Sequence, residues 1–289
     1  MPNSGVFQFF NAIQGTRRHF FLVRMKKARM PPYRRLPAML TVSLAAVLSA
    51  AAPRVVLAQQ PLLMPLASTA GATPPTPWRA VGLPPGKAPL ARFDVVNIDG
   101  VRALKLQTDS SYGTLVHEIS DRTSVADATL KWRWRLDQPL IKADLRKKEG
   151  DDAALKVCVM YDMPLAQVPF VERNLLRLAR SLSKELLPTA TVCYVWDPAL
   201  SPGTVLPNAY SRRVRYLITD GPEAVIGQWQ TRERRTGADF LQLFGDESAV
   251  VPRILAVVVG ADADNTAGNS LGYITDLKLV PQVGNSETK

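Results

Sequence analysis

The chain has 289 residues and a net charge of +11, from 36 Lys and Arg against 25 Asp and Glu, which taken alone would indicate a nucleic-acid partner. Nine of the basic residues and none of the acidic ones lie in residues 1–58, leaving 27 basic and 25 acidic residues, or +2, in the rest. Nucleic-acid binding is therefore disfavoured. The two Cys and the one His beyond this segment, His117, are too few for a tetrahedral zinc site of familiar spacing.

Residues 1–58 have the pattern of an export signal. Arg34 and Arg35 precede an Ala/Leu/Val-rich stretch at 38–52, and small residues lead up to a cleavage site before Gln59. The apolar stretch is shorter than a membrane span, so cleavage is favoured over the alternative of a retained anchor. The true start is Met1, Met25 or Met30. We expect an exported protein, periplasmic or secreted, with no membrane contact once the signal is removed.

The composition after the signal divides the chain into three further parts. Residues 59–77 are rich in Pro, Ala, Ser and Thr and predict a flexible linker. Residues 78–280 have the length and pattern of one folded domain, and residues 281–289 form a polar tail.

Alternation of apolar and polar residues dominates the predicted domain. In residues 130–136, Leu and Trp alternate with Lys and Arg, as in a strand with one buried face. Further strands are predicted at 101–107, 112–119, 154–161, 191–196, 213–218, 253–260 and 272–280. The fold class is mainly β, a two-sheet antiparallel β-sandwich of the jelly-roll or carbohydrate-binding-module type, with one inserted amphipathic helix.

The inserted helix is predicted to end before Pro188. It is indicated by apolar residues spaced three or four apart: Val171, Leu175, Leu178, Leu182 and Leu186. Four basic residues occupy positions between them. The favoured interpretation packs the apolar stripe on a sheet, and the alternative is a role at a membrane surface.

Several stretches, taken together and in order, resemble one bacterial family, DUF3047. They are residues 130–136, 150–162, 193–196, 239–245 and 262–266. The resemblance implies an exported β-sandwich similar in build to carbohydrate-binding modules, and it brings no established activity. The two Cys depart from the family pattern.

Two acidic loops predict a candidate calcium site. Asp151 and Asp152 precede one predicted strand, and Asp262, Asp264 and Asn265 follow another. Carboxylate and amide oxygens are the ligands that Ca²⁺ prefers. The alternative is that these side chains bond to their own backbone in turns.

The same carboxylates allow a hydrolase hypothesis. A pair among Asp151, Asp152, Asp262 and Asp264 could serve glycoside hydrolysis, which needs two carboxyl groups at a set separation. The G-x-S-x-G stretch at 268–272 lacks a downstream His and leads into a strand, so we do not assign a serine nucleophile. No catalytic residue is assigned.

Cys158 and Cys193 both lie in predicted strands. In an exported protein they form either a disulfide or two separate buried thiols, and the sequence leaves both open.

Aromatic and basic residues near strand ends form the candidate binding set: Trp196, Asp197, Tyr210, Trp229, Arg133 and Arg135. Exposed aromatic faces bind sugar rings, but the alternative places the Trp residues in the core and the charges in solvent. We expect a non-catalytic module that binds saccharide or envelope material. The alternatives are a carboxylate-pair hydrolase and a purely structural envelope protein. The oligomeric state is open.

Overall fold

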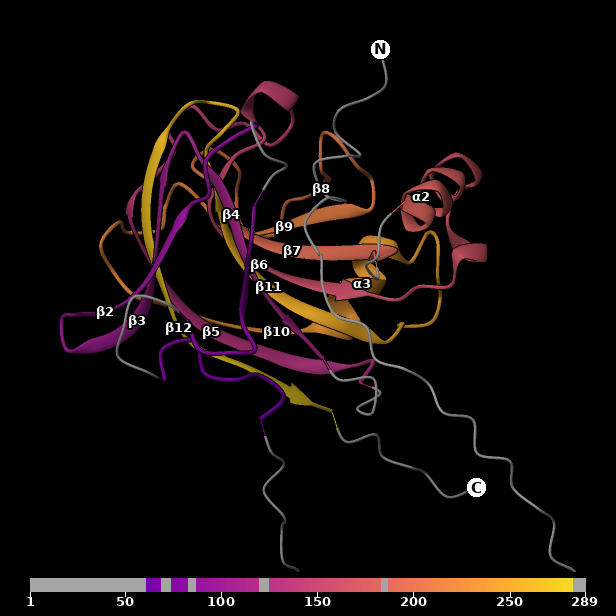
Figure 1. The fold of residues 1–289 in the computed structure, drawn as a ribbon, viewed down its shortest axis with the longest axis horizontal. Coiled ribbons are helices and arrows are strands. Elements are labelled where there is room, and N and C mark those ends of the chain that lie inside the picture. The colour runs from indigo at the N-terminus through magenta and orange to yellow at the C-terminus, as the bar shows by residue number, and fades with distance from the viewer. Residues whose placement is uncertain (1–60, 69–73, 83–86, 120–124, 183–186, 283–289) are drawn as a thin grey trace, which may run out of the picture. The chain divides into compact units, whose positions relative to one another are not determined.

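The computed structural model describes residues 61–68, 74–82, 87–119, 125–182 and 187–282, which all belong to one compact unit (Figure 1). Its strands form two sheets, which we call the large sheet and the small sheet. The large sheet has seven strands in the spatial order β1 (Arg79–Val81), β4 (Tyr112–Glu118), β11 (Ile254–Asp262), β6 (Ala153–Tyr161), β7 (Ala190–Trp196), β9 (Val214–Asp220) and β8 (Val205–Pro207). The small sheet has five, in the order β10 (Gln230–Arg235), β5 (Ala128–Gln138), β12 (Asn269–Pro281), β3 (Val101–Asp109) and β2 (Arg92–Ile98).

Neighbouring strands are antiparallel throughout, apart from the parallel pair β7 and β9. The predicted class, a mainly β two-sheet sandwich, is confirmed. β1, β2, β8 and β10 were not predicted; β1 and β8 have three residues each, and β10 consists mostly of charged residues.

The core lies between the two sheets. β5 alternates as predicted, with Trp132 and Trp134 buried and Lys131 exposed. Its Trp rings meet aromatic rings of β7: Trp132 lies 5.2 Å from Tyr194 and Trp134 lies 6.0 Å from Trp196, between ring centroids. Large aromatic side chains bury more apolar surface than any others, so these four rings are a main source of the sandwich's stability.

The large sheet is buried on both faces. A second apolar cluster lies on its outer face; it is formed mainly by side chains of the sheet itself and includes Val116, Cys158, Val195, Val214 and Val258. Every residue of β6, β7 and β11 is consequently buried. This explains why these strands read in the sequence as continuous apolar runs, without clear alternation.

The predicted linker is wrong in part, because residues 61–68 pack on the sandwich. Leu63 and Leu66 lie in the core. The backbone N–H of Met64 donates to Nε2 of His117, and the indole N–H of Trp78 donates to the carbonyl of Met64. This segment packs because the apolar residues between its prolines provide apolar surface that can be buried against the sandwich. The signal segment 1–58 and the end of the polar tail, from residue 283, lie outside the described residues.

Two helices and two short 3₁₀ turns complete the described structure. α2 (Phe170–Leu182) lies between β6 and β7, and α3 (Thr236–Phe244) follows β10; the 3₁₀ turns are Lys148–Gly150 and Leu165–Gln167. α3 was not predicted; it is short, and it packs Phe240 and Phe244 in the core. In the described part of the chain, no helix is long and apolar enough to cross a membrane.

The packing predicted for α2 is wrong. Val171, Leu175 and Leu178 are exposed, and the helix instead buries Leu176 in the core. The predicted stripe extended through Leu182 to Leu186, but α2 ends at Leu182, and Leu186 lies outside the described residues.

Candidate functional site

The outer face of the large sheet carries a small hollow with an apolar floor and a polar rim. Its cavity volume is about 40 Å³. Its apolar lining, which we call the floor, includes Val116, Cys158, Cys193, Val214 and Val258, and its polar lining, which we call the rim, includes Tyr112, Thr114, Lys156 and Tyr216. These residues come from β4, β6, β7, β9 and β11, so the middle of the sheet itself forms the site and holds it rigidly.

The two cysteines form a disulfide in the floor of the hollow. Cys158 of β6 and Cys193 of β7 lie opposite each other in the antiparallel register, and their sulfurs are bonded at 2.06 Å. The alternative of two separate thiols does not hold.

Lys156 is the unusual residue of this site. Alternation along β6 points it to the same face as Cys158, where its side chain is only 10% exposed. Its ammonium lies 3.2 Å from Oδ2 of Asp262 and 4.9 Å from the ring centroid of Tyr112. The three residues meet because β11, which carries Asp262, lies between β4 with Tyr112 and β6 with Lys156, and Asp262 pairs directly with Tyr112. A cation, a carboxylate and an aromatic ring thus meet at one end of the hollow.

The two acidic loops lie next to each other behind this end. Oxygen atoms of Asp152, Asp262 and Asp264 all lie within 4.8 Å of one another. The Asp152 carboxylate accepts four hydrogen bonds, from the backbone N–H and the amide of Asn265 and from the backbone N–H and the hydroxyl of Thr266. Asp152 therefore acts as a clamp between the two loops.

One carboxylate oxygen of Asp262 has no donor among the described residues, and Asp264 is a hydrogen-bonding neighbour of this carboxyl group. Oδ2 pairs with Lys156, while Oδ1 is buried and accepts no hydrogen bond from the described residues. Burial raises the pKa of Asp262 well above its ordinary value; the Lys156 charge opposes this rise, and the nearby Asp264 and Asp152 add to it. The cluster has more carboxylates than cations, so a proton or a bound cation is favoured there.

Asp151 belongs to a separate group of hydrogen bonds beside the hollow. Its carboxylate accepts from the amide of Asn208 at 2.5 Å and from the hydroxyl of Tyr216 at 3.0 Å. Burial raises the pKa of Asp151 to about 6, against the lowering effect of Lys156. A carboxyl group of this pKa can exchange a proton near neutral pH.

The five predicted calcium ligands are thus near one another, but they differ in whether their oxygen atoms are already used in hydrogen bonds. The carboxylate oxygens of Asp151 and Asp152 accept hydrogen bonds from neighbouring side chains and backbone. The side-chain amide of Asn265 donates to Asp152 and accepts from Tyr210. Oδ1 of Asp262 and the half-buried Asp264 are the oxygens best placed to bind a cation.

The predicted binding residues do not share one surface. Trp196 is a core residue against Trp134, and its proposed role as an exposed platform is wrong. Asp197 is buried and caps the backbone N–H groups of Ala199 and Leu200, so its binding role is wrong as well. Trp196 ends the apolar run of β7, whose residues are all buried, and Asp197 directly follows that run.

The other predicted binding residues occupy two distant places in the fold. Arg133 and Arg135 lie on the outer face of the small sheet, paired with Asp276 and with Asp99 and Asp137. The guanidinium of Arg133 lies 5.2 Å from the ring centroid of half-buried Trp229. Tyr210 instead joins the acidic loops, where its hydroxyl lies 2.9 Å from Oδ1 of Asn265 and 3.0 Å from the carbonyl oxygen of Lys148, and it can donate to either.

Sequence reasoning missed Tyr112, Thr114, Lys156 and Tyr216. One signal was available: Lys156 is the only charged residue in the apolar run 153–161. A charge inside a buried strand needs a partner, and it therefore marks a site. Ser270, from the rejected G-x-S-x-G stretch, is buried in β12 with its hydroxyl 2.6 Å from that of Thr108.

Residues 76–278 match the model of a family described as "Protein of unknown function (DUF3047)". The match spans β1 to β12, and so the whole sandwich with its hollow. The chain belongs to the DUF3047 family. No curated protein matches it.

Solved structures similar to this DUF3047 protein include two carbohydrate-binding modules. TmCBM61 in complex with β-1,4-galactotriose is 14% identical, with a TM-score of 0.34, covering 78% of this chain and 100% of that one. The family 11 module from Clostridium thermocellum, with a mixed-linked tetrasaccharide, is 8% identical at a TM-score of 0.36, covering 75% and 99%. The endo-1,4-β-glucanase CelB2 is 10% identical at a TM-score of 0.39, covering 71% and 93%.

Proposed function

We propose that this DUF3047 protein is an exported, non-catalytic module that binds saccharide in the hollow of the large sheet. The observation that carries the proposal is the composition of the hollow: an apolar floor bordered by Tyr112, Thr114 and Lys156. A sugar ring has an apolar face of C–H groups and a periphery of hydroxyls, and it needs both kinds of surface together. The acid-free segment 1–58 and the disulfide support export to the periplasm or beyond, since disulfides persist in oxidising compartments.

The rim supplies hydrogen-bonding groups of both kinds. The Lys156 ammonium has three N–H donors, of which one is used by Asp262. Tyr112 is half-buried as a residue, and burial of its hydroxyl, which lies beside Thr114, raises its pKa. The cavity is smaller than a sugar ring, so the ligand rests in the opening with one edge inserted. This geometry favours a chain end or one ring of a longer chain.

A second candidate, glycoside hydrolysis, is favoured by the raised pKa of Asp151, about 6, and by the three clustered carboxylates. The hydrogen bonds argue against it. Asp151 and Asp152 are held by two and four hydrogen bonds, and Asp262 is paired with Lys156. A hydrolase needs carboxyl groups that can reach the substrate, so binding is the better-supported function.

The test is a glycan array, followed by calorimetry on the parent protein and on matched variants. Tyr112→Ala is expected to weaken binding at least about tenfold, which corresponds to about 1.4 kcal/mol of lost contacts. Trp229→Ala on the small sheet is the control and is expected to leave affinity unchanged. A loss confined to Trp229→Ala would move the site to the small sheet, and the absence of any glycan binding would overturn the proposal. Release of product from chromogenic glycosides, abolished by Asp151→Asn, would establish the hydrolase instead.

We also propose that Ca²⁺ binds at Asp262 and Asp264, on the strength of the buried Asp262 oxygen that has no donor among the described residues. Calcium is expected to raise the melting temperature by several degrees, because it binds the folded state alone. Protons compete for Asp262, whose pKa is raised, so the effect should be larger at pH 8 than at pH 5. Asp264→Asn should abolish the calcium effect.

The matched control for calcium is Asp276→Asn, which removes a carboxylate on the small sheet. It is expected to keep the full calcium effect. Equal melting temperatures of the parent protein in CaCl₂ and in EDTA at pH 8 would contradict the site.

A further inference from the structure

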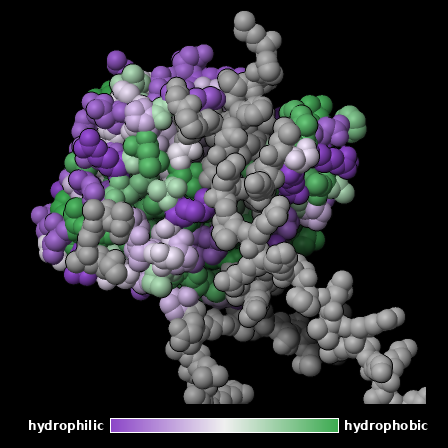
Figure 2. All heavy atoms as spheres, in the orientation of Figure 1, coloured by the Kyte–Doolittle hydropathy of each residue, from purple (hydrophilic) through white to green (hydrophobic). Residues whose placement is uncertain are grey.

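α2 turns its apolar face to the solvent. Four large apolar side chains on it are exposed: Phe170 at 72%, Val171 at 69%, Leu175 at 42% and Leu178 at 59%. Figure 2 shows apolar and hydrophilic residues side by side over this helix, at the right of the view. A contiguous apolar surface of this kind, rimmed by polar residues, marks an interaction site.

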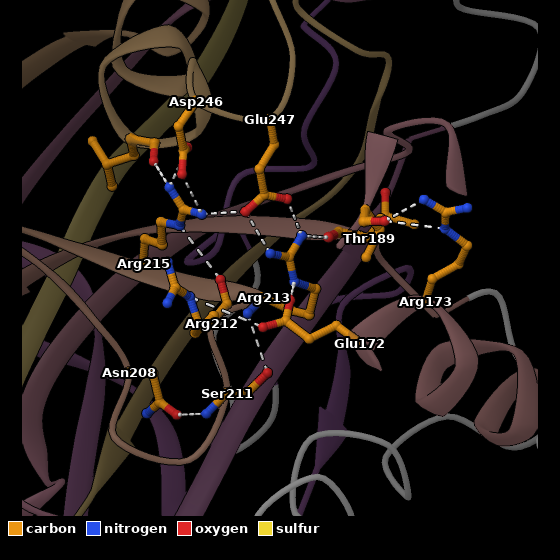
Figure 3. Close-up of polar contacts among 12 residues, drawn as sticks. Glu172, Arg173, Thr189, Asn208, Ser211, Arg212, Arg213, Arg215, Asp246 and Glu247 are labelled. Atoms are coloured by element: carbon orange, nitrogen blue, oxygen red, sulfur yellow. Dashed lines mark hydrogen bonds and ion pairs between the residues drawn. The ribbon is translucent and has the colours of Figure 1, made fainter. Parts of the chain in front are cut away.

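The opposite side of α2 is firmly attached to the sandwich, so the exposure is a settled feature of the fold. Leu176 is buried in the core. Glu172 pairs with Arg213, the residue before β9, which also pairs with Glu247, and Figure 3 shows the two carboxylates on either side of its guanidinium. Arg180 donates to the carbonyl of Leu187.

The charge around this face is positive. α2 carries Arg173, Arg177 and Arg180 against a single acidic residue, Glu172, whose charge is met by Arg213. Of the three arginines, Arg180 pairs with Asp162 at 3.9 Å. Arg177 is exposed and hydrogen-bonds only within the helix, to Asn174, among the contacts of the described residues. Arg212, 67% exposed at its side chain, adds a further cation beside Glu172. The complementary partner is therefore apolar and anionic.

We infer that α2 is an interfacial helix that holds the protein on the surface of an anionic phospholipid bilayer. The helix would lie in the plane of the surface, with Val171, Leu175 and Leu178 among the acyl chains and Arg177 among the headgroups. Self-association through the same face would bring like charges together, which disfavours a second copy as the occupant. The inference replaces the sequence-based expectation of no membrane contact, and it is independent of the saccharide proposal.

The test is sedimentation of the exported protein, with residues 1–58 removed, with vesicles of POPC alone and of POPC with 30% POPG. Binding is expected with POPG, falling steeply between 0.1 M and 0.5 M salt because exposed charges are screened. Leu175→Ser combined with Leu178→Ser should weaken binding at least about tenfold, and Arg177→Gln about fivefold. Both changes are at exposed positions, so thermal unfolding should match that of the parent.

The matched control is Ile141→Ser, which removes a more exposed apolar side chain, 85% exposed, outside α2. It is expected to leave vesicle binding within about twofold of the parent. Equal binding by all variants would place the membrane contact elsewhere in the chain and overturn the inference. Absence of binding to POPG vesicles would overturn it too. So would light scattering that shows a dimer for the parent protein and a monomer for the α2 variant, because a second copy would then occupy this face.

Discussion

Replacing Lys156 with Met is expected to lower the free energy of unfolding by about 3–5 kcal/mol at pH 8 and by much less at pH 4.5. The change leaves Asp262 buried without its cation, next to Asp264 and Asp152. The pKa of Asp262 is already raised, and Lys156 is the group that opposes the rise, so the variant should raise it further. A carboxyl group whose pKa is higher in the folded state stabilises the fold at low pH and loses that contribution as the pH rises. Urea unfolding at the two pH values measures the effect.

The double variant Lys156→Met with Asp262→Asn separates charge from packing. It removes the unpaired carboxylate together with the cation, so most of the stability at pH 8 should return. It should also show no more pH dependence than the parent. If Lys156→Met destabilises equally at both pH values, the cause is lost packing of the Lys side chain, and the assignment of an ion pair at this site fails.

Removing the disulfide by Cys158→Ala with Cys193→Ala is expected to cost about 4 kcal/mol of the free energy of unfolding. The two residues are 35 positions apart, and a cross-link over a loop of that size lowers the entropy of the unfolded chain by roughly this amount. The sheet register itself should survive, because β6 and β7 pair continuously over residues 155–161 and 190–196. Urea unfolding of the variant against the parent measures the loss.

Reduction provides the control for this prediction. A reducing agent should bring the parent close to the stability of the double Ala variant, and it should leave that variant unchanged. Free thiols found in the denatured, unreduced parent would contradict the disulfide, and so would a variant as stable as the parent.

The strands of the sandwich could be predicted from sequence wherever one face of a strand is exposed to solvent. β5 is the clearest case, since its Lys and Arg residues alternate with core Leu and Trp residues. The prediction failed where both faces are buried. Trp196 was predicted to be exposed because nothing in the run 190–196 distinguishes a core position from a surface one, and the second apolar cluster on the large sheet is assembled from distant segments.

The candidate site was predictable in part for the same reason. Asp152 and Asp262 drew attention as polar residues at strand ends, and loops at one end of a sheet meet in space. Asp152 joins the two loops and Asp262 pairs with a buried cation, and these roles depend on partners far away in sequence. The partners are Thr266 for Asp152 and Lys156 for Asp262. The spacing of apolar residues predicted that α2 is a helix, but it did not predict which face is buried. That face is set by the ion pair with Arg213 and by burial of Leu176.

The disulfide also determines what a protease could do to this protein. Cys158 and Cys193 lie on either side of residues 162–189, the excursion that carries α2 away from two directly paired strands. A single cut in that excursion would leave both pieces covalently joined and both strands still in register. The helix is thus displayed on a closed loop, and the sandwich could tolerate nicking there until a reductant releases the two fragments.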